Sequence, residues 1–406
     1  MKILFLNQMF YPETAAVAQH LTDLAQALSA RGHTVTVIAG RSGYNDPTIQ
    51  YAAKERLAQI DIRRVSSGRF PKNNLVGRIA GAFLFFFNVT LGAMFAGRQD
   101  VVVGMTNPPL ISVVAALFCI VRGGRFVYWV MDLNPDEAIA AGVLRQRSIA
   151  AWVLEQVSRF TLRTASKIIA LDAFMAERVA RKIGSSSTIE VVSPWSPHGH
   201  IRPIAHAENQ FRNEHRLQKK FVVMYSGNHS LCHPLDTMLQ AALALSEDPS
   251  VVFVFIGDGV RARDVAVFRS LHGLTNIVQL PYQVIDKIAY SLSAADLHVV
   301  TMGDRYVGIV HPSKIYGILA VGRPFIYVGP RASAIAALVR ETGLGLCVDH
   351  GDVDSFVNGV KRFRDQPIVE SSELSARMTA YGKDHFGAEV ILPRFVNLLE
   401  EVGAHG

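Results

Sequence analysis

Two successive series of short apolar runs, each alternating with helix-like segments, constrain the fold of this chain more than any other feature. The first series of strand-like runs covers residues 2–7, 34–40, 100–105, 125–132, 167–172 and 189–194. The second covers residues 221–227, 251–259, 276–281, 297–302, 324–329 and 343–349. Strands that alternate with helices favour a parallel sheet with helices on both faces. The sequence therefore predicts an α/β protein with two doubly wound domains facing a cleft.

A segment without this pattern separates the two series. Residues 194–220 are rich in proline, histidine and charge, and show no strand pattern. A chain of 406 residues is long enough for two domains, each with its own core. We therefore expect a first domain at 1–195, a linker at 196–220, a second domain at 221–386, and a last helix, within 387–406, that returns to the first domain.

The composition fits a globular protein with anionic partners. Half of the residues are hydrophobic and 18% are charged, which excludes a disordered chain. The net charge of +7 suits nucleotides, phospholipid head groups or nucleic acid, without choosing among them. Cys119, Cys232 and Cys347 are few and far apart, which disfavours disulfides and fits a reducing cytoplasm. The N-terminal run MKILFLNQMFYP is interpreted as a first strand and not as a signal peptide.

Two apolar segments leave room for contact with a membrane. Residues 79–96 are flanked by Arg69, Lys72 and Arg78 on one side and by Arg98 on the other, and a second apolar run covers 110–121. One interpretation is a pair of buried helices. The other places 79–96 as an interfacial helix on an anionic membrane. A transmembrane helix is the third and least favoured, because it would interrupt the alternation of strands and helices.

Ligands of doubly wound sheets bind at the carboxyl ends of the strands, so the loops there are the candidate sites. After the first strand, Glu13 and Thr14 precede a helix, with Thr14 in a position suited to capping it. The pair is either a plain helix start or a contact for a polar substrate.

A second acidic loop follows the strand at 125–132. Asp132, Asp136 and Glu137 lie together at the end of that strand and the start of the next helix. Acidic residues stabilise a helix N-terminus in any case. The alternative is that a carboxylate orients or deprotonates an acceptor hydroxyl.

In the second domain, two glycine-containing loops stand out. One carries Gly227, Asn228 and His229, and glycine lets the backbone approach a ligand closely. A metal site built from His229, Cys232 and His233 would need more ligands than the sequence supplies, so we predict none. The other loop carries Gly257, Asp258 and Gly259. It is not GxGxxG, and GxxxxGK[ST] is absent from the chain, which disfavours nicotinamide and P-loop chemistry.

The stretch VHPSKIYGILAVGRP, residues 310–324, places a lysine at a predicted helix start. Pro312 suits a first turn and Ser313 can cap it. Lys314 beside the positive end of a helix is unfavourable unless an anion binds there. A diphosphate meets that description, and an ordinary exposed lysine is the alternative.

The order and spacing of several segments resemble a known family. They are LTDLAQALSARGHTVTV (21–37), VYWVMDLNPDEAIAAGVL (127–144), MYSGNHSLCHPLDTML (224–239), SLSAADLHVV (291–300) and VGIVHPSKIYGILAVGRP (307–324). The chain resembles the GT-B glycosyltransferases of glycosyltransferase family four, in the branch that builds bacterial polysaccharide and lipid-linked oligosaccharide. The resemblance covers nearly the whole chain and implies two Rossmann-like domains.

The resemblance also implies a reaction and a set of site residues. It implies a hexosyl- or N-acetylhexosaminyl-type transferase that acts with retention, without a bound metal or any cofactor beyond its donor, a UDP- or GDP-linked sugar. Asp132 and Lys314 would be catalytic, and Glu13, Thr14 and Asp132 would contact the acceptor in the first domain. Donor-binding residues in the second domain would be Gly227, Asn228, His229, Gly257, Asp258, Gly259, Pro281, Tyr282, His311, Ser313, Lys314, Ile315 and Tyr316.

The chain departs from the family pattern at several of these positions. The two glutamates that the family often carries eight residues apart fall at Ile309 and Gly317, so we expect the ribose to be held by Tyr316 or by backbone groups. The histidine expected before Asp132 is Met131. Asn228, His229 and His233 replace the usual basic pair. The sugar, the base, the acceptor and the oligomeric state do not follow from the sequence.

Three functions are consistent with these residues. The favoured one is a glycosyltransferase for a lipid-linked or other polysaccharide-precursor acceptor, in the cytoplasm and peripheral on the inner face of the plasma membrane, with no nucleic-acid partner. The alternatives are a nucleotide-sugar epimerase on the same fold and a non-catalytic partner subunit. The absent glutamates favour the last alternative, and Lys314 argues against it.

Overall fold

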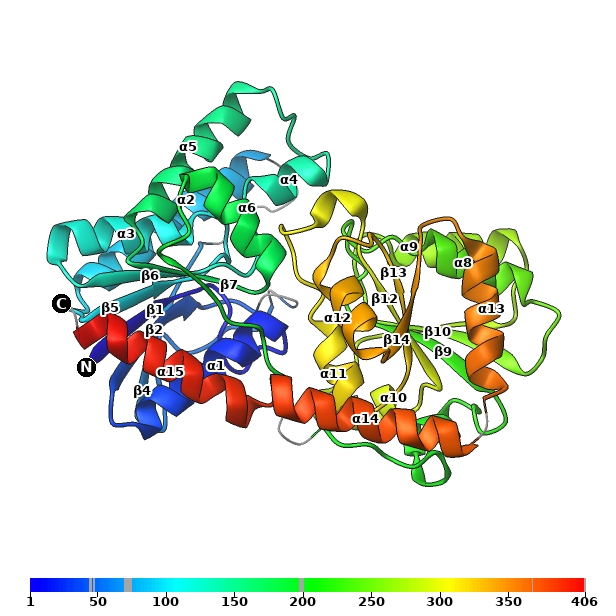
Figure 1. Ribbon diagram of the computed structural model, residues 1–406. Helices are drawn as coiled ribbons and strands as arrows, with labels where there is room; N and C mark the ends of the chain where they lie inside the picture. Colours follow the sequence, from blue (N-terminus) through cyan, green and yellow to red (C-terminus); the bar gives the residue numbers. More distant parts are fainter. Residues whose placement is uncertain (44–45, 47, 69–74, 197–200, 367, 405–406) are drawn as a thin grey trace. The chain divides into compact units, whose positions relative to one another are not determined.

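The computed structural model describes the whole chain except residues 44, 45, 47, 69–74, 197–200, 367, 405 and 406. The chain divides into two compact units (Figure 1). The first comprises Met1–Ser193 and Ile391–Gly406, and the second comprises Pro194–Val390. Each unit is a mainly parallel sheet with helices on its faces, so the prediction of two Rossmann-like α/β halves is confirmed.

The sheet of the first unit has eight strands in the order β3-β4-β2-β1-β5-β6-β7-β8. Every neighbouring pair is parallel except β3 and β4. Strands of a parallel sheet are covered on both faces, which explains why the central ones are continuous apolar runs. The strands are β1 (Lys2–Leu6), β2 (Thr34–Gly40), β3 (Lys54–Leu57), β4 (Ile60–Val65), β5 (Val101–Gly104), β6 (Arg125–Trp129), β7 (Lys167–Ala170) and β8 (Ile189–Val191).

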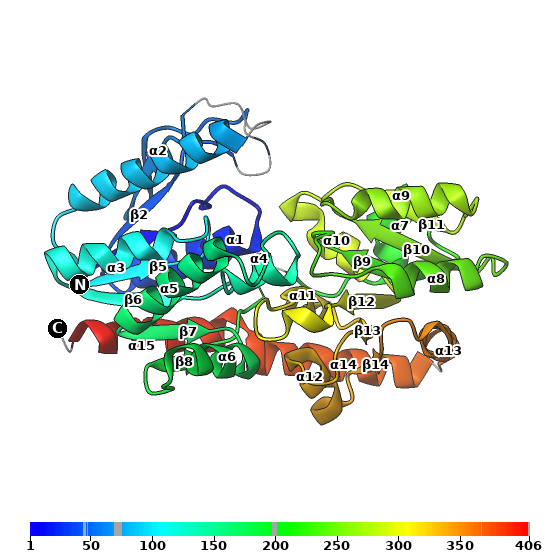
Figure 2. The same cartoon turned by 90° about the horizontal axis from the view of Figure 1, so that it is seen from above.

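Helices cover both faces of this sheet, and three of them lie next to one another on one face. Figure 1 shows α2, α3 and α5 on one side of the sheet and α1 and α15 on the other. The middle helix of the three, α3, packs against both α2 and α5 (Figure 2). The helices are α1 (Ala16–Ala30), α2 (Leu75–Met94), α3 (Ile111–Arg122), α4 (Asp136–Ala140), α5 (Ile149–Thr164), α6 (Ala173–Ile183) and α15 (Ala388–Ala404).

The β3–β4 hairpin is a feature that the apolar runs did not predict. Its two strands are short and rich in charge: β3 reads KERL, and in β4, IDIRRV, buried and more exposed positions alternate. That pattern belongs to an edge hairpin with one buried side, where Ile60 and Ile62 are buried. Neither strand is a continuous apolar run, so the pattern that predicts buried parallel strands does not predict this hairpin.

The second unit has a six-stranded, fully parallel sheet in the order β11-β10-β9-β12-β13-β14. Its strands are β9 (Phe221–Ser226), β10 (Val251–Ile256), β11 (Ile277–Leu280), β12 (Leu297–Thr301), β13 (Phe325–Val328) and β14 (Gly345–Val348). Its helices are α7 (Gln210–Glu214), α8 (Asp236–Ala244), α9 (Ala262–Leu271), α10 (Ile288–Ser293), α11 (Lys314–Ala320), α12 (Ala334–Thr342), α13 (Val353–Arg364) and α14 (Ile368–Phe386), with short 3-10 turns at His206–Glu208, Ile285–Lys287 and Asp304–Tyr306.

The described part of the segment predicted to be a linker packs onto the second unit. Phe211 and Leu217 are buried in a cluster with β9 and β10 residues. The buried guanidinium of Arg212 donates to the carbonyls of Ala294 and Leu217 and pairs with Asp296 at 2.9 Å. A buried charge needs such partners. The sequence pattern did not predict this packing, because the segment is held by a few separate side chains and has no regular hydrophobic period.

The C-terminal helix α15 belongs, from Ile391 onward, to the first unit. Its buried stripe includes Ile391, Phe395 and Leu399, and the Phe395 ring lies edge-on to Trp129 with the ring centres 4.7 Å apart. Glu400 accepts hydrogen bonds from Arg31 and His33 near the end of α1. One apolar face and one polar anchor therefore attach the helix to this unit.

Candidate functional site

Three predicted glycines of the second unit lie where the backbone is crowded at the carboxyl ends of β9 and β10. A β-carbon added to Gly257 would lie 2.2 Å from the carbonyl oxygen of Gly227, and one added to Gly259 would lie 2.5 Å from Oδ1 of Asn228. All three glycines have positive φ angles, of +133°, +126° and +141° in chain order. Glycine is the residue that adopts such angles without strain. The two loops, predicted separately, therefore form one glycine-lined site.

Lys314 extends from the start of α11 to this site. A β-carbon on Gly227 would lie 2.7 Å from its Cε, and its ammonium lies 4.9 Å from the centre of the Tyr225 ring. No ion pair of Lys314 occurs among the residues that the structure describes. Burial lowers the pKa of this ammonium to about 8. A half-buried cation with no carboxylate partner, beside a glycine backbone, is a site for an anion.

Tyr225 is a contributor that the sequence did not single out. Its ring lies under Lys314, and its hydroxyl donates to the carbonyl of Asn228 at 2.7 Å. Tyr225 is part of the buried strand β9, and nothing in the sequence of a buried strand distinguishes an aromatic residue of a binding site from one of the core. The spatial proximity of Lys314 is what identifies it.

The two histidines of the first loop are buried rather than presented on its surface. His229 is 1% exposed, its ring packs against Tyr225 and Phe255, and neither ring nitrogen meets hydrogen-bond geometry. Burial, and then the charge of Lys314, lower its pKa, although the nearby carbonyls of Gly227 and Asp258 act in the opposite direction. His233 bonds through Nδ1 to the carbonyl of Thr301. Both rings are buried beneath the loop, and burial lowers the pKa of each, which favours the neutral imidazole.

Further predicted residues border the site. The Tyr282 hydroxyl donates to the Asp258 carbonyl at 3.3 Å, and the same carbonyl accepts from the backbone of His229. Pro281 and Tyr282 are exposed at the end of β11, next to the Gly257 loop. A ring and a backbone edge at this place offer a surface on which a planar group can stack.

The start of α11 differs from the prediction in two respects. Ser313 is the N-cap residue, but its side chain makes no capping hydrogen bond. The helix has only seven residues, so the expected helix-dipole effect is small and the charge of Lys314 itself is the main attraction for an anion. Ile315 is buried, and Tyr316 is buried with its hydroxyl 2.7 Å from Nε2 of His311. The Tyr316 hydroxyl that we considered for the ribose thus already has a protein partner.

The acidic loop after β6 separates into two groups. Asp136 pairs with Lys182 at 2.7 Å and with Arg178 at 3.1 Å. Asp132 has no such partner within the described residues, and burial followed by the charge of Glu137 raises its pKa to about 7. Burial likewise raises the pKa of Glu137. Asp132 and Glu137 are therefore two carboxyl groups whose pKa values are both raised, whereas Asp136 is a structural ion-pair partner.

The predicted capping role of Thr14 is wrong. The N-cap of α1 is Ala15, which has no side chain able to cap, and the carbonyl of Thr14 accepts from Gln19. Glu13 accepts a hydrogen bond from the Tyr51 hydroxyl at 3.3 Å, and Tyr51 in turn lies under the guanidinium of Arg64. Glu13 is thus positioned by a side chain far along the chain, which the local sequence pattern does not reveal.

The described residues bear on both the metal and the membrane predictions. Within the described ranges, no cluster of three or more histidine, cysteine, aspartate or glutamate side chains is arranged to hold a metal ion. Within the same ranges, no helix combines the length and the apolar character needed to cross a bilayer. The flanking residues Arg69 and Lys72 and the side chain of Arg78 lie outside the described part of the chain.

Comparison with known proteins gives matches along both units. Residues 15–195 match the glycosyl transferase 4-like domain family, and residues 220–366 match the glycosyl transferases group 1 family. The probable glycosyltransferase WbjE of Pseudomonas aeruginosa is 28% identical over 287 residues, covering 68% of this chain and 70% of WbjE. WcaI of Escherichia coli, whose name describes a colanic acid biosynthesis glycosyl transferase, is 22% identical over 98% of this chain and 99% of its own.

Solved structures share the fold at low identity. HepE of Anabaena, solved with UDP and glucose, superposes with a TM-score of 0.74 at 17% identity, covering 99% of this chain and all of HepE. WaaG, a glycosyltransferase involved in lipopolysaccharide biosynthesis, gives a TM-score of 0.72 at 13% identity, covering 98% of this chain and 99% of WaaG. Together, the two family matches, the named relatives and the shared architecture show that the chain belongs to the GT-B glycosyltransferases of family four.

Proposed function

We propose that this glycosyltransferase moves a sugar, with retention, from a nucleoside-diphosphate sugar to a lipid-linked or other amphiphilic precursor of a cell-envelope polysaccharide. The observation that carries the donor assignment is the ammonium of Lys314 against the Gly227 backbone, which makes no ion pair with any residue that the structure describes. The family resemblance supports retention and the absence of a metal. HepE has been solved with UDP-glucose, which supports a UDP-linked donor here, with GDP as the alternative.

The chemistry needs a cation at the position of Lys314. In glycosyl transfer the bond from the anomeric carbon to the phosphate oxygen breaks, and a bond from that carbon to the acceptor oxygen forms. Negative charge grows on the departing diphosphate, and a preorganised donor lowers the barrier by stabilising it. Lys314 supplies that charge, and the crowded glycine backbone lets phosphate oxygens come close.

Asp132 is proposed to act on the acceptor side. A carboxyl group with a pKa of about 7 is ionised in part at neutral pH and can accept a hydrogen bond or a proton from an acceptor hydroxyl. Burial, and then the charge of Glu137, raise this pKa. Glu13, held by Tyr51, is proposed as a further acceptor contact.

The proposed membrane contact is the surface formed by α2, α3 and α5. Their outward faces carry large exposed apolar side chains: Phe83, Phe87 and Leu91 on α2, Phe95 just after it, Leu117, Ile120 and Val121 on α3, and Ile149, Trp152, Val153 and Phe160 on α5. Three neighbouring helices with such faces are unusual on a monomeric surface and mark an interaction site. A peripheral position on the inner face of the plasma membrane would bring an amphiphilic acceptor within reach, and colanic acid and lipopolysaccharide in the names of WcaI and WaaG agree with such an acceptor.

The test is a panel of UDP- and GDP-linked sugars incubated with the purified protein and with lipid-phosphate acceptors, following release of nucleoside diphosphate. We expect release with one donor, dependent on acceptor, and a donor-dependent rise in Tm. Interconversion of the donor sugar without release would instead identify an epimerase. Absence of both release and thermal shift would leave only a non-catalytic subunit.

A further inference from the structure

The β3–β4 hairpin at the edge of the first unit's sheet has two chemically different sides. In the antiparallel register Lys54 lies directly opposite Arg63. Strand alternation places Val65 on the same side of β4 as Arg63, and a β-carbon added to Gly92 of α2 would lie 3.9 Å from Val65. The side with Lys54 and Arg63 therefore faces α2, and the residue between Arg63 and Val65, Arg64, points to the opposite side.

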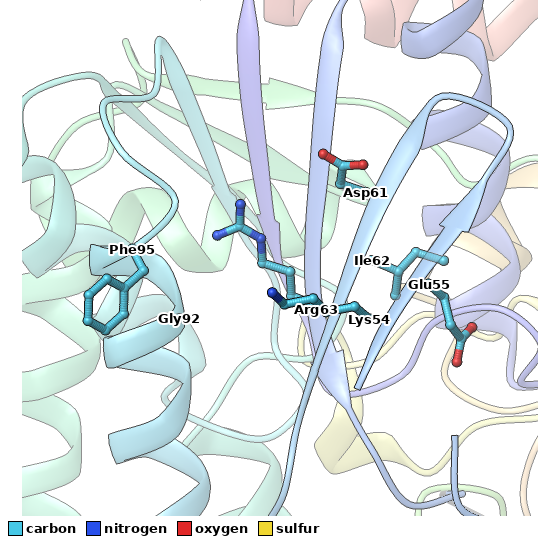
Figure 3. Close-up of a pocket in the computed structure, with 7 residues that line it drawn as sticks. All are labelled: Lys54, Glu55, Asp61, Ile62, Arg63, Gly92 and Phe95. Carbon is cyan, nitrogen blue, oxygen red and sulfur yellow. The ribbon is translucent and has the colours of Figure 1, made fainter. Parts of the chain in front are cut away.

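Arg64 is a buried cation whose donors are distributed over several acceptors. Its side chain is 1% exposed. Its Nε donates to Glu55 at 3.1 Å, and Figure 3 shows Glu55 pointing away from the side of the hairpin that carries Lys54. Nη1 donates to the carbonyl of Gly40 at 3.2 Å, and Nη2 donates to the carbonyl of Tyr11. A guanidinium presents its donors in a rigid fork, so Arg64 fixes the relative positions of these acceptors.

The two carbonyls that Arg64 holds determine the course of the loop after β1. Tyr11 lies in that loop, two residues before Glu13. Gly40, at the end of β2, donates its backbone N–H to the carbonyl of Gln8 at 2.8 Å. The loop is thus attached to β2 near its start and to Arg64 near its end. Replacing a buried ion pair by apolar residues of similar volume is often neutral or stabilising, so the pair by itself is weak evidence for a role in stability.

Tyr51 connects Arg64 to the carboxylate of Glu13. The guanidinium carbon of Arg64 lies 4.3 Å from the centre of the Tyr51 ring, and the Tyr51 hydroxyl donates to Oε1 of Glu13 at 3.3 Å. The backbone N–H of Tyr51 donates to the carbonyl of Arg41 at 2.8 Å, so the residue is held at its backbone as well as at its ring. Burial, and then the charge of Glu13, raise the pKa of Tyr51, so the hydroxyl keeps its proton and remains a donor.

The contact with Tyr51 orients the Glu13 carboxylate without using up its capacity to accept hydrogen bonds. Two hydrogen-bonded oxygens are usually about 2.7–2.8 Å apart, and this contact is longer. A carboxylate accepts in about four lone-pair directions, of which the Tyr51 hydroxyl takes one. An ionised carboxylate repels a phosphate and accepts from a neutral donor. The acceptor group that suits Glu13 is therefore a hydroxyl, such as those of a saccharide.

We infer that Arg64 and Tyr51 are positioning residues for the acceptor: Arg64 fixes the loop after β1 and the Tyr51 ring, and the Tyr51 hydroxyl aims Glu13 at a saccharide hydroxyl of the acceptor. This role rests on the proposed function and deepens it by naming the acceptor group that Glu13 recognises. All three residues belong to the first unit, whereas the predicted donor residues belong to the second. Changes in Arg64 and Tyr51 should therefore alter the use of the acceptor and not the binding of the donor.

The test is a double-mutant cycle of Tyr51→Phe and Glu13→Gln. Transfer is measured with the donor that gives release in the panel above and with a saccharide joined through phosphate to a lipid chain as the acceptor. Tyr51→Phe keeps the ring under Arg64 and removes only the hydroxyl, so we expect the acceptor KM to rise about 5-fold, with a smaller change in kcat. Adding Tyr51→Phe to Glu13→Gln should raise the acceptor KM no further, because Tyr51 acts only through Glu13.

Two further variants separate positioning from folding. Arg64→Lys should raise the acceptor KM at least as far as Tyr51→Phe and should also lower Tm, because an ammonium cannot reproduce the fork that holds both carbonyls. Tyr381→Phe, which removes the hydroxyl of a half-buried tyrosine on α14, is the matched control and should change neither KM nor Tm. The donor-dependent rise in Tm should be the same in wild type and Tyr51→Phe.

The remaining outcomes count against the inferred role in distinct ways. Additive effects in the cycle would show that Tyr51 acts independently of Glu13. A smaller donor-dependent rise in Tm for Tyr51→Phe would assign Tyr51 to the fold as a whole. If the wild type transfers and Tyr51→Phe has the same acceptor KM, the positioning role alone is refuted. If the wild type releases no nucleoside diphosphate with any donor, the proposed function is refuted, and the positioning role with it.

Discussion

The glycine-lined site of the second unit and the outward face of the first unit both present cations, but in opposite settings. Lys314 is half-buried, lies against backbone and ring, and has its pKa lowered to about 8. Lys54 and Arg63 lie at a sheet edge beside an exposed phenylalanine. A desolvated cation interacts strongly with one bound group, whereas exposed cations are screened and act mainly by attracting a charged surface. The difference predicts large, local effects in the second unit and smaller, salt-dependent ones in the first.

The largest expected effect is that of Lys314→Ala. Removing the single cation from the leaving-group side should lower kcat/KM for transfer by about 10²- to 10³-fold, as for the loss of one preorganised donor. Stability should fall little, because Lys314 has no ion pair within the described residues. Steady-state kinetics and thermal unfolding measure the two quantities, with Lys361→Ala as the control. If activity and stability fell together, Lys314 would have a structural role. The contrast between the glycine-lined site and the outward face of the first unit would then be lost.

Gly227→Ala tests whether the close approach of the glycine backbone is part of the donor site. The added methyl group would meet Lys314 Cε at 2.7 Å, so we expect Lys314 to shift and donor affinity to fall by about 10-fold. Gly273→Ala is the control, since Gly273 also has a positive φ but its added methyl group would meet nothing within 4 Å. Both should lose stability, by about 1 kcal/mol, from backbone strain. Donor titrations that find both variants unimpaired would argue against the glycine-lined site.

Trp152→Ser tests the outward face of the first unit away from the hairpin. Trp152 is 64% exposed on α5, so its loss should leave Tm nearly unchanged. Vesicle affinity should fall by about 10-fold if the ring enters the membrane interface. Leu271→Ser on α9 of the second unit removes a side chain that is 76% exposed and serves as the matched control. Equal affinities of Trp152→Ser and wild type in flotation would confine the membrane contact to α2 and α3.

Asp132→Asn tests the carboxyl pair through its pH dependence. The folded-state pKa of Asp132 lies above its unfolded value, so the unfolded state releases the proton first and the wild-type protein loses stability as pH rises from about 4 to 7. The asparagine variant lacks this loss. Its Tm advantage should therefore grow across that window and level off above pH 7, while its transfer activity no longer rises through a pKa near 7. Asp384→Asn, an exposed control, should show neither change, and a pH-independent difference for Asp132→Asn would remove the acceptor-side proposal.

The smallest expected effect is that of Ser313→Ala. Its hydroxyl makes no capping bond, so unfolding free energy should change by less than about 0.5 kcal/mol. Ser333→Ala, which removes a real cap of α12 that also bonds the Tyr327 hydroxyl, should cost about 1 kcal/mol. Denaturant titrations compare the two. A loss of donor affinity without a loss of stability for Ser313→Ala would sharpen the site by adding a hydroxyl contact to Lys314.

Apart from the β3–β4 hairpin, the strands and the loops at their carboxyl ends were predictable, whereas several anchors were not. The apolar runs located the strands because parallel strands are buried on both faces. Arg212 and Phe211 attach the supposed linker to the second unit, and Tyr51 holds Glu13, through contacts between residues that no local period connects. The cap predicted at Thr14 failed because the chain begins α1 one residue later, and helix boundaries are the least certain part of a pattern.

By itself, the sequence determined the two α/β halves, the glycine loops at 227 and 257–259, and a lysine at 314 in the unfavourable position of a helix start. Periodicity and turn chemistry are local properties, which is why the sequence displays them. Only the tertiary structure decided that Lys314 lies against Gly227, that His229 points into the core, and that Lys54 faces Arg63 beneath α2. Those juxtapositions depend on sheet order and strand register. Both follow from packing between distant segments, which the order of residues along the chain does not display.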